Sequence, residues 1–234
     1  MLNTIAIHQP NYIPWLGYFY KIYQAQTFVF LDNVQYSNKG MHDYHYLKTP
    51  QGSFRIKIPI KYSFGDKIQD VLLNSQINWR ENHLKQIDSN YKKAPFFSAV
   101  FADIVELMKI KTESLSELNA EIIKFICGKF GIETKFVFSS ELEISDNEKN
   151  DRIIAICKSL NANVYYSGTG AAAYQNADTF SQNGVELRYS NFKPFEYNQL
   201  WGPFQSNVSI IDYLMHYGYD WQRVLDNQLI NNIL

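Results

Sequence analysis

The sequence predicts an α/β fold built on a doubly wound, mostly parallel sheet. Two apolar segments near the amino terminus, residues 4–7 and 27–31, are rich in β-branched and aromatic side chains. An apolar-rich segment at residues 15–23, which favours a helix, separates them. A strand, a helix and a second strand in this order form a parallel pair, and strands and helices alternate again further along the chain. The first 32 residues therefore predict a βαβ unit.

The middle of the chain departs from this alternation in two places. Residues 54–60 alternate apolar and polar side chains after a glycine turn, which predicts a small antiparallel insertion at about residues 42–62. The section from about residue 78 to residue 131 is expected to be helical. Its last helix begins at a capping box, Ser114 to Glu117, and stops at Gly131.

Strands and helices alternate again toward the carboxyl terminus. We expect strands at residues 134–138, 163–167 and 185–189, and helices at residues 151–160, 209–217 and 221–229. No internal repeat and no linker rich in Gly, Pro and Ser interrupts the 234 residues. The sequence therefore predicts a single domain over residues 1–234.

Composition and charge exclude several classes of protein. Hydrophobic residues make up 46% and charged residues 19%, as in a globular chain. The formal net charge of −1 argues against nucleic acid as a partner. No apolar run reaches the ~20 residues of a membrane span and no secretory signal is visible, so we expect a cytoplasmic protein without a membrane partner. We expect Cys127 and Cys157 to be buried reduced thiols, and we expect no metal site.

The loop after the first expected strand is the first candidate site. It begins at His8, at the sheet edge where open α/β proteins bind ligands. Prolines stiffen it, and Gly17 permits close approach of a ligand to the start of the following helix. The alternative is a stiff loop whose histidine and asparagine only cap local backbone. Its other candidate ligand-binding residues are Gln9 and Asn11, which can hydrogen-bond a ligand, and Tyr12, Trp15 and Tyr18, which can stack on one.

A second strand end carries Asp32 and Gln35, which we expect at the same sheet edge as His8. A carboxylate beside an imidazole orients the ring and raises its pKa, so Asp32 is a candidate partner of His8 in acid–base chemistry. It could equally hold Mg²⁺ or accept a sugar hydroxyl. The plainer alternative is an aspartate that caps a turn after a strand.

Two further groups complete the candidate set. Lys39, His42, His45 and Lys48 form a locally basic segment, which predicts either a phosphate clamp or a solvated positive face. Ser167 and Gly168 end a third strand, and Arg152 on the preceding helix could pair with a phosphate or with a surface acid. The aromatic, turn-rich segment at residues 192–204 is either a lid over a site or a packed loop.

Several of these motifs together resemble the WbqC-like family. They are the run from His8 to Phe19, Phe30 to Tyr36, Tyr166-Ser167-Gly168, and Phe204 with Asn207 to Leu214, and the resemblance spans essentially the whole chain. It implies a cytoplasmic enzyme of surface-polysaccharide biosynthesis, often of the O-antigen of lipopolysaccharide. It also implies transfer of an amino-acid or other acyl group, such as glycine, to an amino sugar.

One departure and one weaker similarity accompany this resemblance. Members of the family commonly carry an Asn-Arg-Asn type segment where this chain has His45, and a neutral histidine is a poor phosphate ligand. The opening of the chain is also similar to HIGH-motif nucleotidyltransferases such as pantothenate synthetase, although only His8 of that motif is matched. This second similarity implies a HUP-like fold and ATP, with Mg²⁺, as a cofactor.

Two hypotheses of function follow. The first is a transferase or ligase that joins a small carboxylate or acyl donor to the amine of a nucleotide-linked amino sugar, with His8 and Asp32 as catalytic residues. The second is a non-catalytic nucleotide-sugar binding protein within a biosynthetic complex. The sequence does not specify the acyl donor, the sugar, the nucleotide or the oligomeric state.

Overall fold

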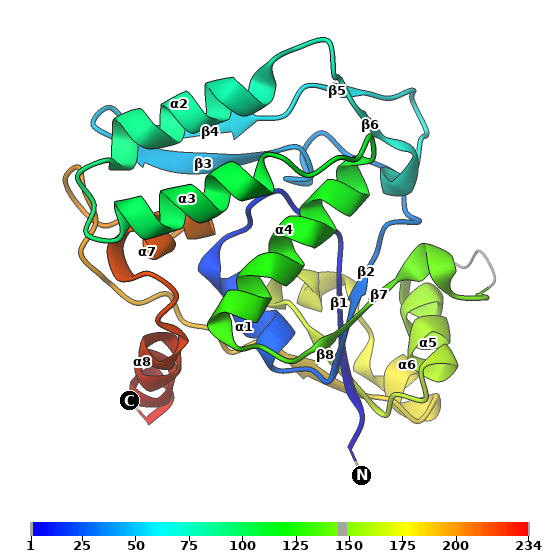
Figure 1. Cartoon of the computed structure of the whole chain (residues 1–234). Coiled ribbons are helices and arrows are strands. Elements are labelled where there is room, and N and C mark those ends of the chain that lie inside the picture. The colour runs from blue at the N-terminus through cyan, green and yellow to red at the C-terminus, as the bar shows by residue number, and fades with distance from the viewer. Residues whose placement is uncertain (1, 145–148, 234) are drawn as a thin grey trace. The chain divides into compact units, whose positions relative to one another are not determined.

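The chain folds into two compact units, each assembled from separate stretches of sequence. A computed structural model describes residues 2–144 and 149–233 (Figure 1). Unit 1 comprises Met1–Pro10, Gly17–Val34 and Ile132–Phe192, and unit 2 comprises Asn11–Leu16, Gln35–Gly131 and Lys193–Leu234. The expected antiparallel insertion and helical middle section both fall within unit 2.

Unit 1 contains the predicted parallel sheet. Its five strands, all parallel, lie in the order β7-β2-β1-β8-β9. Their bounds are Thr4–His8 for β1, Thr27–Phe30 for β2, Lys135–Phe138 for β7, Val164–Ser167 for β8 and Glu186–Tyr189 for β9. Taken along the chain within the unit, the order is third, second, first, fourth, fifth. The direction of strand addition therefore reverses between β1 and β8.

Helices cover both faces of this sheet, which confirms the doubly wound α/β prediction. Helix α1 (Leu16–Tyr23) lies on one side, and α5 (Lys149–Ser159) and α6 (Ala177–Gln182) lie on the other (Figure 1). Ile5 and Ile7 of β1 pack with Ile156 of α5 and Phe180 of α6. Burial of these apolar side chains on a sheet face is the main force holding helix to sheet.

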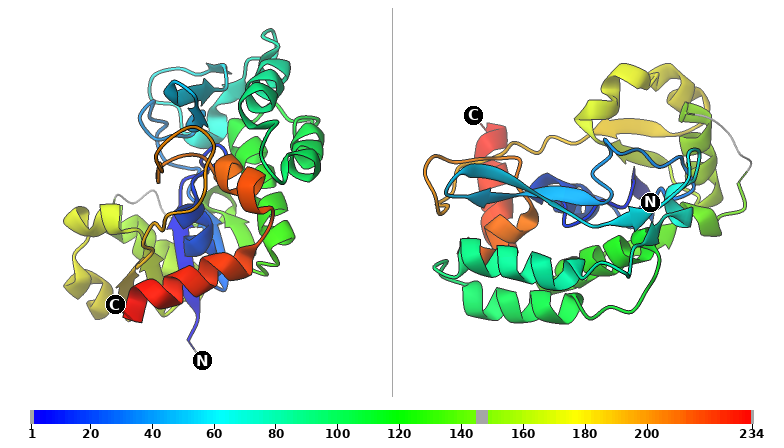
Figure 2. Two further views of the ribbon diagram at one scale, coloured as in Figure 1. Left: turned by 90° about the vertical axis from the view of Figure 1, so that its left-hand side faces the viewer. Right: turned by 90° about the horizontal axis from the view of Figure 1, so that it is seen from above.

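Unit 2 combines two hairpins with three consecutive helices. Strands β3 (Tyr44–Thr49) and β4 (Gly52–Lys57) pair antiparallel, as predicted, and the short β5 (Ile60–Lys61) and β6 (Leu72–Leu73) form a second pair that the sequence did not reveal. The helices are α2 (Trp79–Tyr91), α3 (Phe97–Leu107) and α4 (Leu115–Phe130), and α7 (Ile210–Tyr217) and α8 (Trp221–Ile233) follow near the end of the chain. Figure 2 shows α2 and α3 packed side by side.

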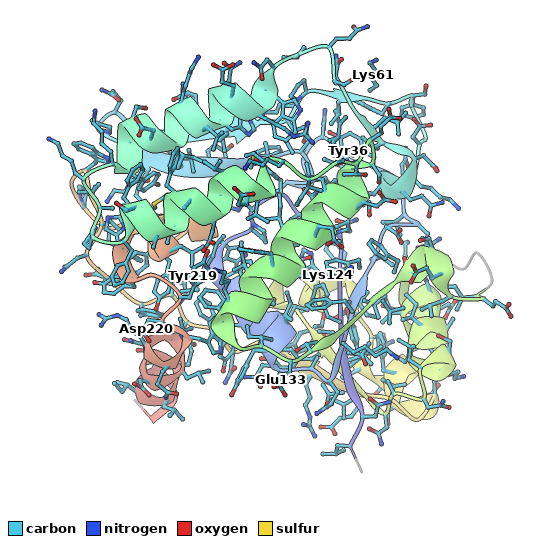
Figure 3. All side chains as sticks on the ribbon, in the orientation of Figure 1. Tyr36, Lys61, Lys124, Glu133, Tyr219 and Asp220 are labelled. Atoms are coloured by element: carbon cyan, nitrogen blue, oxygen red, sulfur yellow. The ribbon has the colours of Figure 1, made fainter. Side chains whose placement is uncertain are left out.

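The predicted boundaries of α4 are confirmed. The Ser114 hydroxyl accepts the Glu117 backbone N–H, and Gly131 ends the helix with a φ of 71°, a conformation that glycine adopts without strain. Tyr219, labelled in Figure 3, lies at the junction of α7 and α8. Its hydroxyl donates to Asp103 of α3 at 2.9 Å, which joins two helical segments of the unit.

Short elements escaped the sequence prediction because three to six residues carry too little periodicity to be recognised. They are the 3₁₀ turns Ile68–Asp70, Ser139–Glu141 and Thr169–Tyr174, together with α6. Cys127 and Cys157 are free and buried, as predicted. Throughout residues 2–144 and 149–233, the helices fall short of the length and apolar character that crossing a bilayer requires.

Candidate functional site

The carboxyl ends of β1 and β8 lie at the reversal point of the unit 1 sheet. Strands on either side of such a point leave the sheet in opposite directions, so a crevice opens at their carboxyl ends, and open α/β sheets bind ligands there. β1 ends at His8 and β8 ends at Ser167, with Gly168 next along the chain. The sheet therefore brings together His8, Ser167 and Gly168, as the sequence predicted.

His8 is held in a defined orientation. Its Nδ1 lies 3.0 Å from the backbone oxygen of Gln9. Its ring packs edge-to-face against the ring of Tyr18, with the two ring centroids 4.8 Å apart. A carbonyl oxygen can only accept a hydrogen bond, so Nδ1 carries the hydrogen and Nε2 is the basic nitrogen of the neutral ring. The Tyr18 hydroxyl donates to the same Gln9 oxygen at 2.9 Å. The half-buried His8 is thus fixed from two sides.

Lys21 is a neighbour of this strand end that the sequence reasoning missed. It is buried within α1, and its Nζ donates to the backbone oxygen of Ile7, one residue before His8, at 2.6 Å. Burial lowers the pKa of Lys21 to about 7. The only signal in the sequence was a single lysine among apolar residues of a short helix, where an exposed position is the usual expectation.

The structure does not support the pairing of Asp32 with His8. Asp32 is 3% exposed, and its carboxylate accepts hydrogen bonds from the Ser139 hydroxyl at 2.9 Å and from the Ser140 hydroxyl at 2.7 Å. The Ser140 backbone N–H donates to it at 3.0 Å. Asp32 therefore joins the end of β2 to the turn after β7, on the side of β2 away from β1. This bonding corresponds to the turn-capping alternative.

A groove of about 500 Å³ opens beside these strand ends in unit 1. Among the described residues that line it, the charged ones are Lys149 and Arg152, both basic and both in the first turn of α5. Arg152 also donates to the Asn33 backbone oxygen at 3.4 Å, so α5 contacts the loop that follows β2. The remaining lining residues are Leu31, Val34, Asn150, Ile153, Tyr165, Ala171, Tyr174 and Gln175.

Ser167 and Gly168 have different roles at the edge of this groove. Ser167 is fully buried, and its hydroxyl donates to the Tyr165 hydroxyl at 3.3 Å. Gly168 opens the exposed turn Thr169–Tyr174, and a Cβ at this position would meet no atom within 4 Å. Gly168 therefore leaves open space at the strand end, whereas Ser167 supports Tyr165, a wall of the groove.

The other candidate residues of the first loop are accounted for within each unit separately. Gln9 holds His8 and Tyr18 through its backbone, and Gly17 is buried in the first turn of α1. In unit 2, Asn11 is 8% exposed and Trp15 is half-buried, and Gln35 is exposed and forms an isolated antiparallel bridge with Lys67. The placement of these residues leaves their expected contacts with a ligand as predictions.

The stacking role predicted for Tyr12 and Tyr18 is wrong. Tyr12 is fully buried in unit 2, where its hydroxyl donates to His83 Nδ1 at 2.9 Å. Tyr18 is 3% exposed in unit 1 and uses its hydroxyl on Gln9. Apolar neighbours cover both rings because an aromatic side chain gains more free energy from burial than from exposure at a loop surface.

The expected basic surface at residues 39–48 is also wrong. Lys39 is exposed, but His42 and Lys48 are fully buried and His45 is 2% exposed. Burial lowers the pKa of His45 to about 4, so its ring is neutral at pH 7. A phosphate clamp therefore lacks three of the four cations that the sequence suggested.

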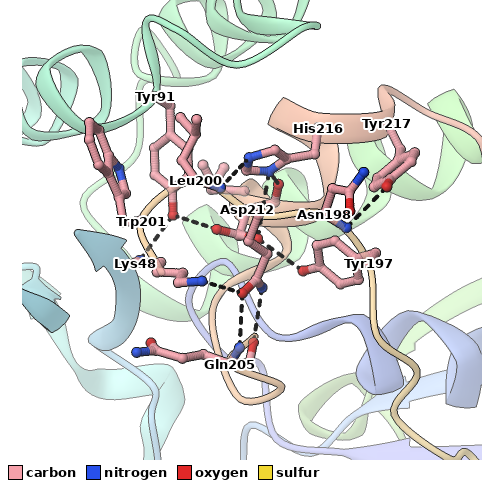
Figure 4. A network of polar contacts seen from close by, with 12 residues as sticks. Lys48, Tyr91, Tyr197, Asn198, Leu200, Trp201, Gln205, Asp212, His216 and Tyr217 are labelled. Atoms are coloured by element: carbon pink, nitrogen blue, oxygen red, sulfur yellow. Dashed lines mark hydrogen bonds and ion pairs between the residues drawn. The ribbon is translucent and has the colours of Figure 1, made fainter. Parts of the chain in front are cut away.

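Lys48 instead belongs to a buried polar network in unit 2 (Figure 4). Its ammonium donates to Gln199 Oε1 at 2.9 Å and to the backbone oxygens of Gly202 and Pro203 at 3.3 and 2.6 Å. These three bonds use all three hydrogens of the ammonium. Burial raises the pKa of the Asp212 carboxyl on α7, and the positive charge of Lys48 is one of the influences that oppose this rise.

Asp212 and His216 complete this network. The Tyr91 and Tyr197 hydroxyls each donate to Asp212 at 3.1 Å. His216 Nε2 accepts the Leu200 N–H at 2.9 Å, so the hydrogen of the ring sits on Nδ1, which donates to the Asp212 backbone oxygen at 2.7 Å. Both ring nitrogens of His216 therefore have partners within this network.

The same contacts decide whether the aromatic segment near the carboxyl terminus is a lid or a packed loop. Trp201 Nε1 donates to the Asn90 backbone oxygen at 2.9 Å. The Gln199 side-chain amide donates to the backbone oxygen of Gln205 and accepts a hydrogen bond from its backbone N–H. With the Lys48 and Tyr197 bonds, residues 197–205 are anchored along their length. They form a packed loop within unit 2.

We predict that acid destabilises unit 2 through two histidines. Burial lowers the pKa of both His45 and His83 to about 4, whereas the unfolded chain protonates them near their ordinary pKa of about 6.5. As pH falls from 6.5 toward 4, the unfolded state binds more protons, and each histidine removes up to about 3 kcal/mol of stability. Urea unfolding at pH 7.0 and 4.5 measures this loss.

The matched control for this prediction is His83→Gln. It removes one titrating group, so its loss of stability between pH 7.0 and 4.5 should be smaller than that of the unmodified chain. Equal urea midpoints at the two pH values for the unmodified chain would contradict the prediction.

Comparison with known proteins places the chain in a family. It matches the sequence profile of the WbqC-like protein family over residues 9–224. The chain belongs to the WbqC-like family. This WbqC-like chain is also 31% identical over 222 residues to a protein of Mycobacterium tuberculosis (strain ATCC 25618 / H37Rv) named "Uncharacterized protein Rv1507c", and the match covers 93% of this chain and 95% of that protein. No solved structure matches the chain significantly.

Membership of the WbqC-like family suggests a role in polysaccharide biosynthesis and points to a biosynthetic enzyme. Within the described residues, no three His, Cys, Asp or Glu side chains gather in a way that could hold a metal ion.

Proposed function

We propose that the chain is a transferase or ligase of surface-polysaccharide biosynthesis, and that the unit 1 groove binds the nucleotide part of its substrate. The observation that carries this proposal is the groove itself. It adjoins the carboxyl ends of β2 and β8 in a five-stranded sheet, the place where such folds bind nucleotides, and the charged side chains among its described lining residues are basic. Lys149 and Arg152 suit phosphate oxygens, and Tyr174, which is 79% exposed, offers a ring to a base.

The reaction that we propose is acylation of an amine on a nucleotide-linked amino sugar by an amino acid such as glycine. The amine attacks the acyl carbon of the activated donor, an amide bond forms, the activating group leaves, and the amine loses a proton. Neutral His8 carries its hydrogen on Nδ1, so its basic Nε2 is the nitrogen that takes that proton. ATP with Mg²⁺, when bound, would supply the leaving group that activates the carboxylate.

A binding protein without catalysis is the second candidate function. One observation favours it: Asp32 and Ser167, two of the polar side chains expected at the sheet edge, are bonded to neighbouring protein groups. Tight binding of a nucleotide-sugar with no product from any amine and acyl donor would decide for this alternative.

The first test is nucleotide binding by variants of the two groove cations. We expect Arg152→Met and Lys149→Met each to weaken binding of UDP and ATP, measured by isothermal titration calorimetry, by about tenfold or more, because each removes a charge-assisted bond to phosphate. Lys158→Met on the same helix α5 is the matched control, since the exposed Lys158 donates to Asn183 and does not line the groove. Unchanged affinity in both groove variants, or no nucleotide binding by the unmodified chain, would refute the assignment.

A further inference from the structure

Lys21 of α1 is a buried lysine of unit 1 that lies outside the proposed nucleotide groove. Its Nζ donates to the Ile7 backbone oxygen at 2.6 Å, and the residue is 5% exposed. Within residues 2–144 and 149–233, this oxygen is the hydrogen-bond acceptor that the structure provides for an ammonium with three donors. Two donors of a buried group are therefore left without acceptors, and such burial is unfavourable.

The charge of Lys21 is also uncompensated. Lys21 forms no ion pair with another described residue, and burial is what lowers its pKa to about 7. The elements around it, α1, β1, β2 and β8, contain no Asp or Glu. The titratable side chains that share its face of the sheet are an imidazole and phenols, those of His8, Tyr18, Tyr20 and Tyr166.

The strand pairing fixes the place of the Lys21 ammonium in the sheet. Successive carbonyl groups of a strand point to opposite sides. His8 directs its oxygen to β2, where the Leu31 N–H donates to it at 2.9 Å, so the oxygen of Ile7 points to β8. The pairing of β1 with β8 ends one residue earlier, at Ala6. Lys21 therefore donates to Ile7 at the point where β1 and β8 separate.

This point is where the strand order of the unit 1 sheet reverses, and ligands of open α/β sheets bind there. Continued past Ala6, the register of β1 and β8 places Gly168 opposite His8. A Cβ at Gly168 would meet no atom within 4 Å, so the glycine leaves space on the β8 side. The Lys21 ammonium and the His8 imidazole therefore belong to the same strand end.

A buried lysine with a structural role is bonded differently in this chain. Lys48 has no exposed surface, and its ammonium donates to three protein oxygens, those of Gln199, Gly202 and Pro203. Lys21 has one such oxygen. The missing acceptors and the missing negative charge are together what an anion supplies.

We propose that Lys21 binds an anionic oxygen of a substrate, from a phosphate or a carboxylate, where β1 and β8 separate. An ammonium is a point charge with rotatable donors, so it suits either group. The proposal deepens the proposed function by adding a substrate contact beside His8. It rests on that function for the choice of probes.

The test follows the protonation of Lys21 itself. The Cε resonance of Lys21, assigned by its absence in Lys21→Met, is titrated by NMR in the full chain. The probes are inorganic phosphate, glycine, UDP and ATP, each at about 10 mM, a concentration that detects weak complexes. We expect at least one probe to raise the pKa of Lys21 by about one unit or more, because an anion that prefers the charged amine tenfold has that effect.

The response to each probe identifies the source of the anion. A shift with phosphate, UDP or ATP assigns the contact to a phosphate group, and a shift with glycine assigns it to a carboxylate. Lys48 is the matched control within the same spectra. Its resonance should not respond, because protein oxygens already accept its three hydrogens.

Affinity provides a second readout, one that a purely structural lysine would not change. Lys21→Met should weaken binding of the responding probe by about tenfold or more in calorimetry at pH 7, since it removes a charge-assisted bond. In the unmodified chain, binding should also weaken as the pH rises from about 7 to about 9, because the amine loses its charge. Lys21→Met should remove this pH dependence, and circular dichroism confirms that the variant is folded.

Two outcomes would overturn the proposal: a pKa of Lys21 that none of the four probes changes, or equal affinity of the responding probe for the unmodified chain and Lys21→Met. Failure of the nucleotide site is a distinct result. If Arg152→Met weakens nucleotide binding while Lys21 responds to no probe, the groove assignment stands and this inference falls. If Lys21 responds to phosphate or glycine in a chain that binds no nucleotide, this inference stands and the groove assignment falls.

Discussion

Lys48→Met is expected to destabilise the protein by about 3–5 kcal/mol, because a buried ammonium loses its three hydrogen bonds and its attraction for a buried carboxylate together. Lys48 has no exposed surface. Its loss leaves the Asp212 carboxylate buried without a compensating charge and frees three oxygen acceptors, those of Gln199, Gly202 and Pro203. Urea unfolding at pH 7 measures the change, and we expect the loop at residues 197–205 to gain amide hydrogen exchange.

A double variant isolates the electrostatic part of this effect. Asp212→Asn keeps an oxygen that accepts from the Tyr91 and Tyr197 hydroxyls but removes the charge. Lys48→Met/Asp212→Asn should therefore be less destabilised than the sum of the two single variants, by about 1–3 kcal/mol of interaction energy. Lys109→Met is the surface control, because its pair with Glu106 is exposed and contributes less than about 1 kcal/mol. Additive single effects would contradict a Lys48–Asp212 couple.

His8→Ala is expected to lower the rate of sugar acylation by about 10²–10⁴-fold, the usual contribution of a positioned acid or base. The assay uses a UDP-linked amino sugar, glycine and Mg·ATP, and it follows pyrophosphate release and the mass of the sugar. Nucleotide binding should persist, since Lys149 and Arg152 line the groove on α5 and His8 is not among its lining residues.

The control for His8 tests orientation separately from chemistry. Tyr18→Phe removes the hydroxyl bond to Gln9 but keeps the ring that packs against His8. It should lower the rate by no more than about tenfold, because a positioning effect is smaller than loss of the base. Full activity in His8→Ala would remove His8 from the mechanism while leaving the nucleotide groove intact.

Local sequence patterns predicted most of the helices and strands, because the interactions that form these elements act between residues a few positions apart. The N-cap at Ser114 and the glycine stop at Gly131 are both as predicted, since each depends on bonds within one helical turn. The reciprocal bond of the expected capping box is replaced, because the Ser114 N–H donates to the Thr112 hydroxyl oxygen. The parallel pair of β1 and β2 follows from two apolar segments and one connecting helix. The hairpin of β3 and β4 follows from alternation and a glycine turn.

The candidate site was predicted less completely because its chemistry depends on distant partners. His8, Ser167 and Gly168 lie at the predicted strand ends, since the end of a strand can be predicted from the sequence of the strand itself. Asp32 was predicted to be the partner of His8. Its carboxylate instead accepts a hydrogen bond from the Ser139 hydroxyl, which lies 107 residues further along the chain. A local sequence pattern spans only a few residues, so it cannot reveal a partner at this distance along the chain.

The sequence by itself determined the α/β class, the positions of the strand ends and the family to which the chain belongs, because periodicity and motif spacing are local properties. Only the tertiary structure decided that β8 lies beside β1, that Lys48 and His45 are buried, and that Arg152 faces a groove. A charged side chain is placed on the surface by default, and its burial becomes favourable only when folding brings acceptors to it. For Lys48 those acceptors lie more than 150 residues away, which is why a residue that looked like a phosphate clamp is part of an internal network.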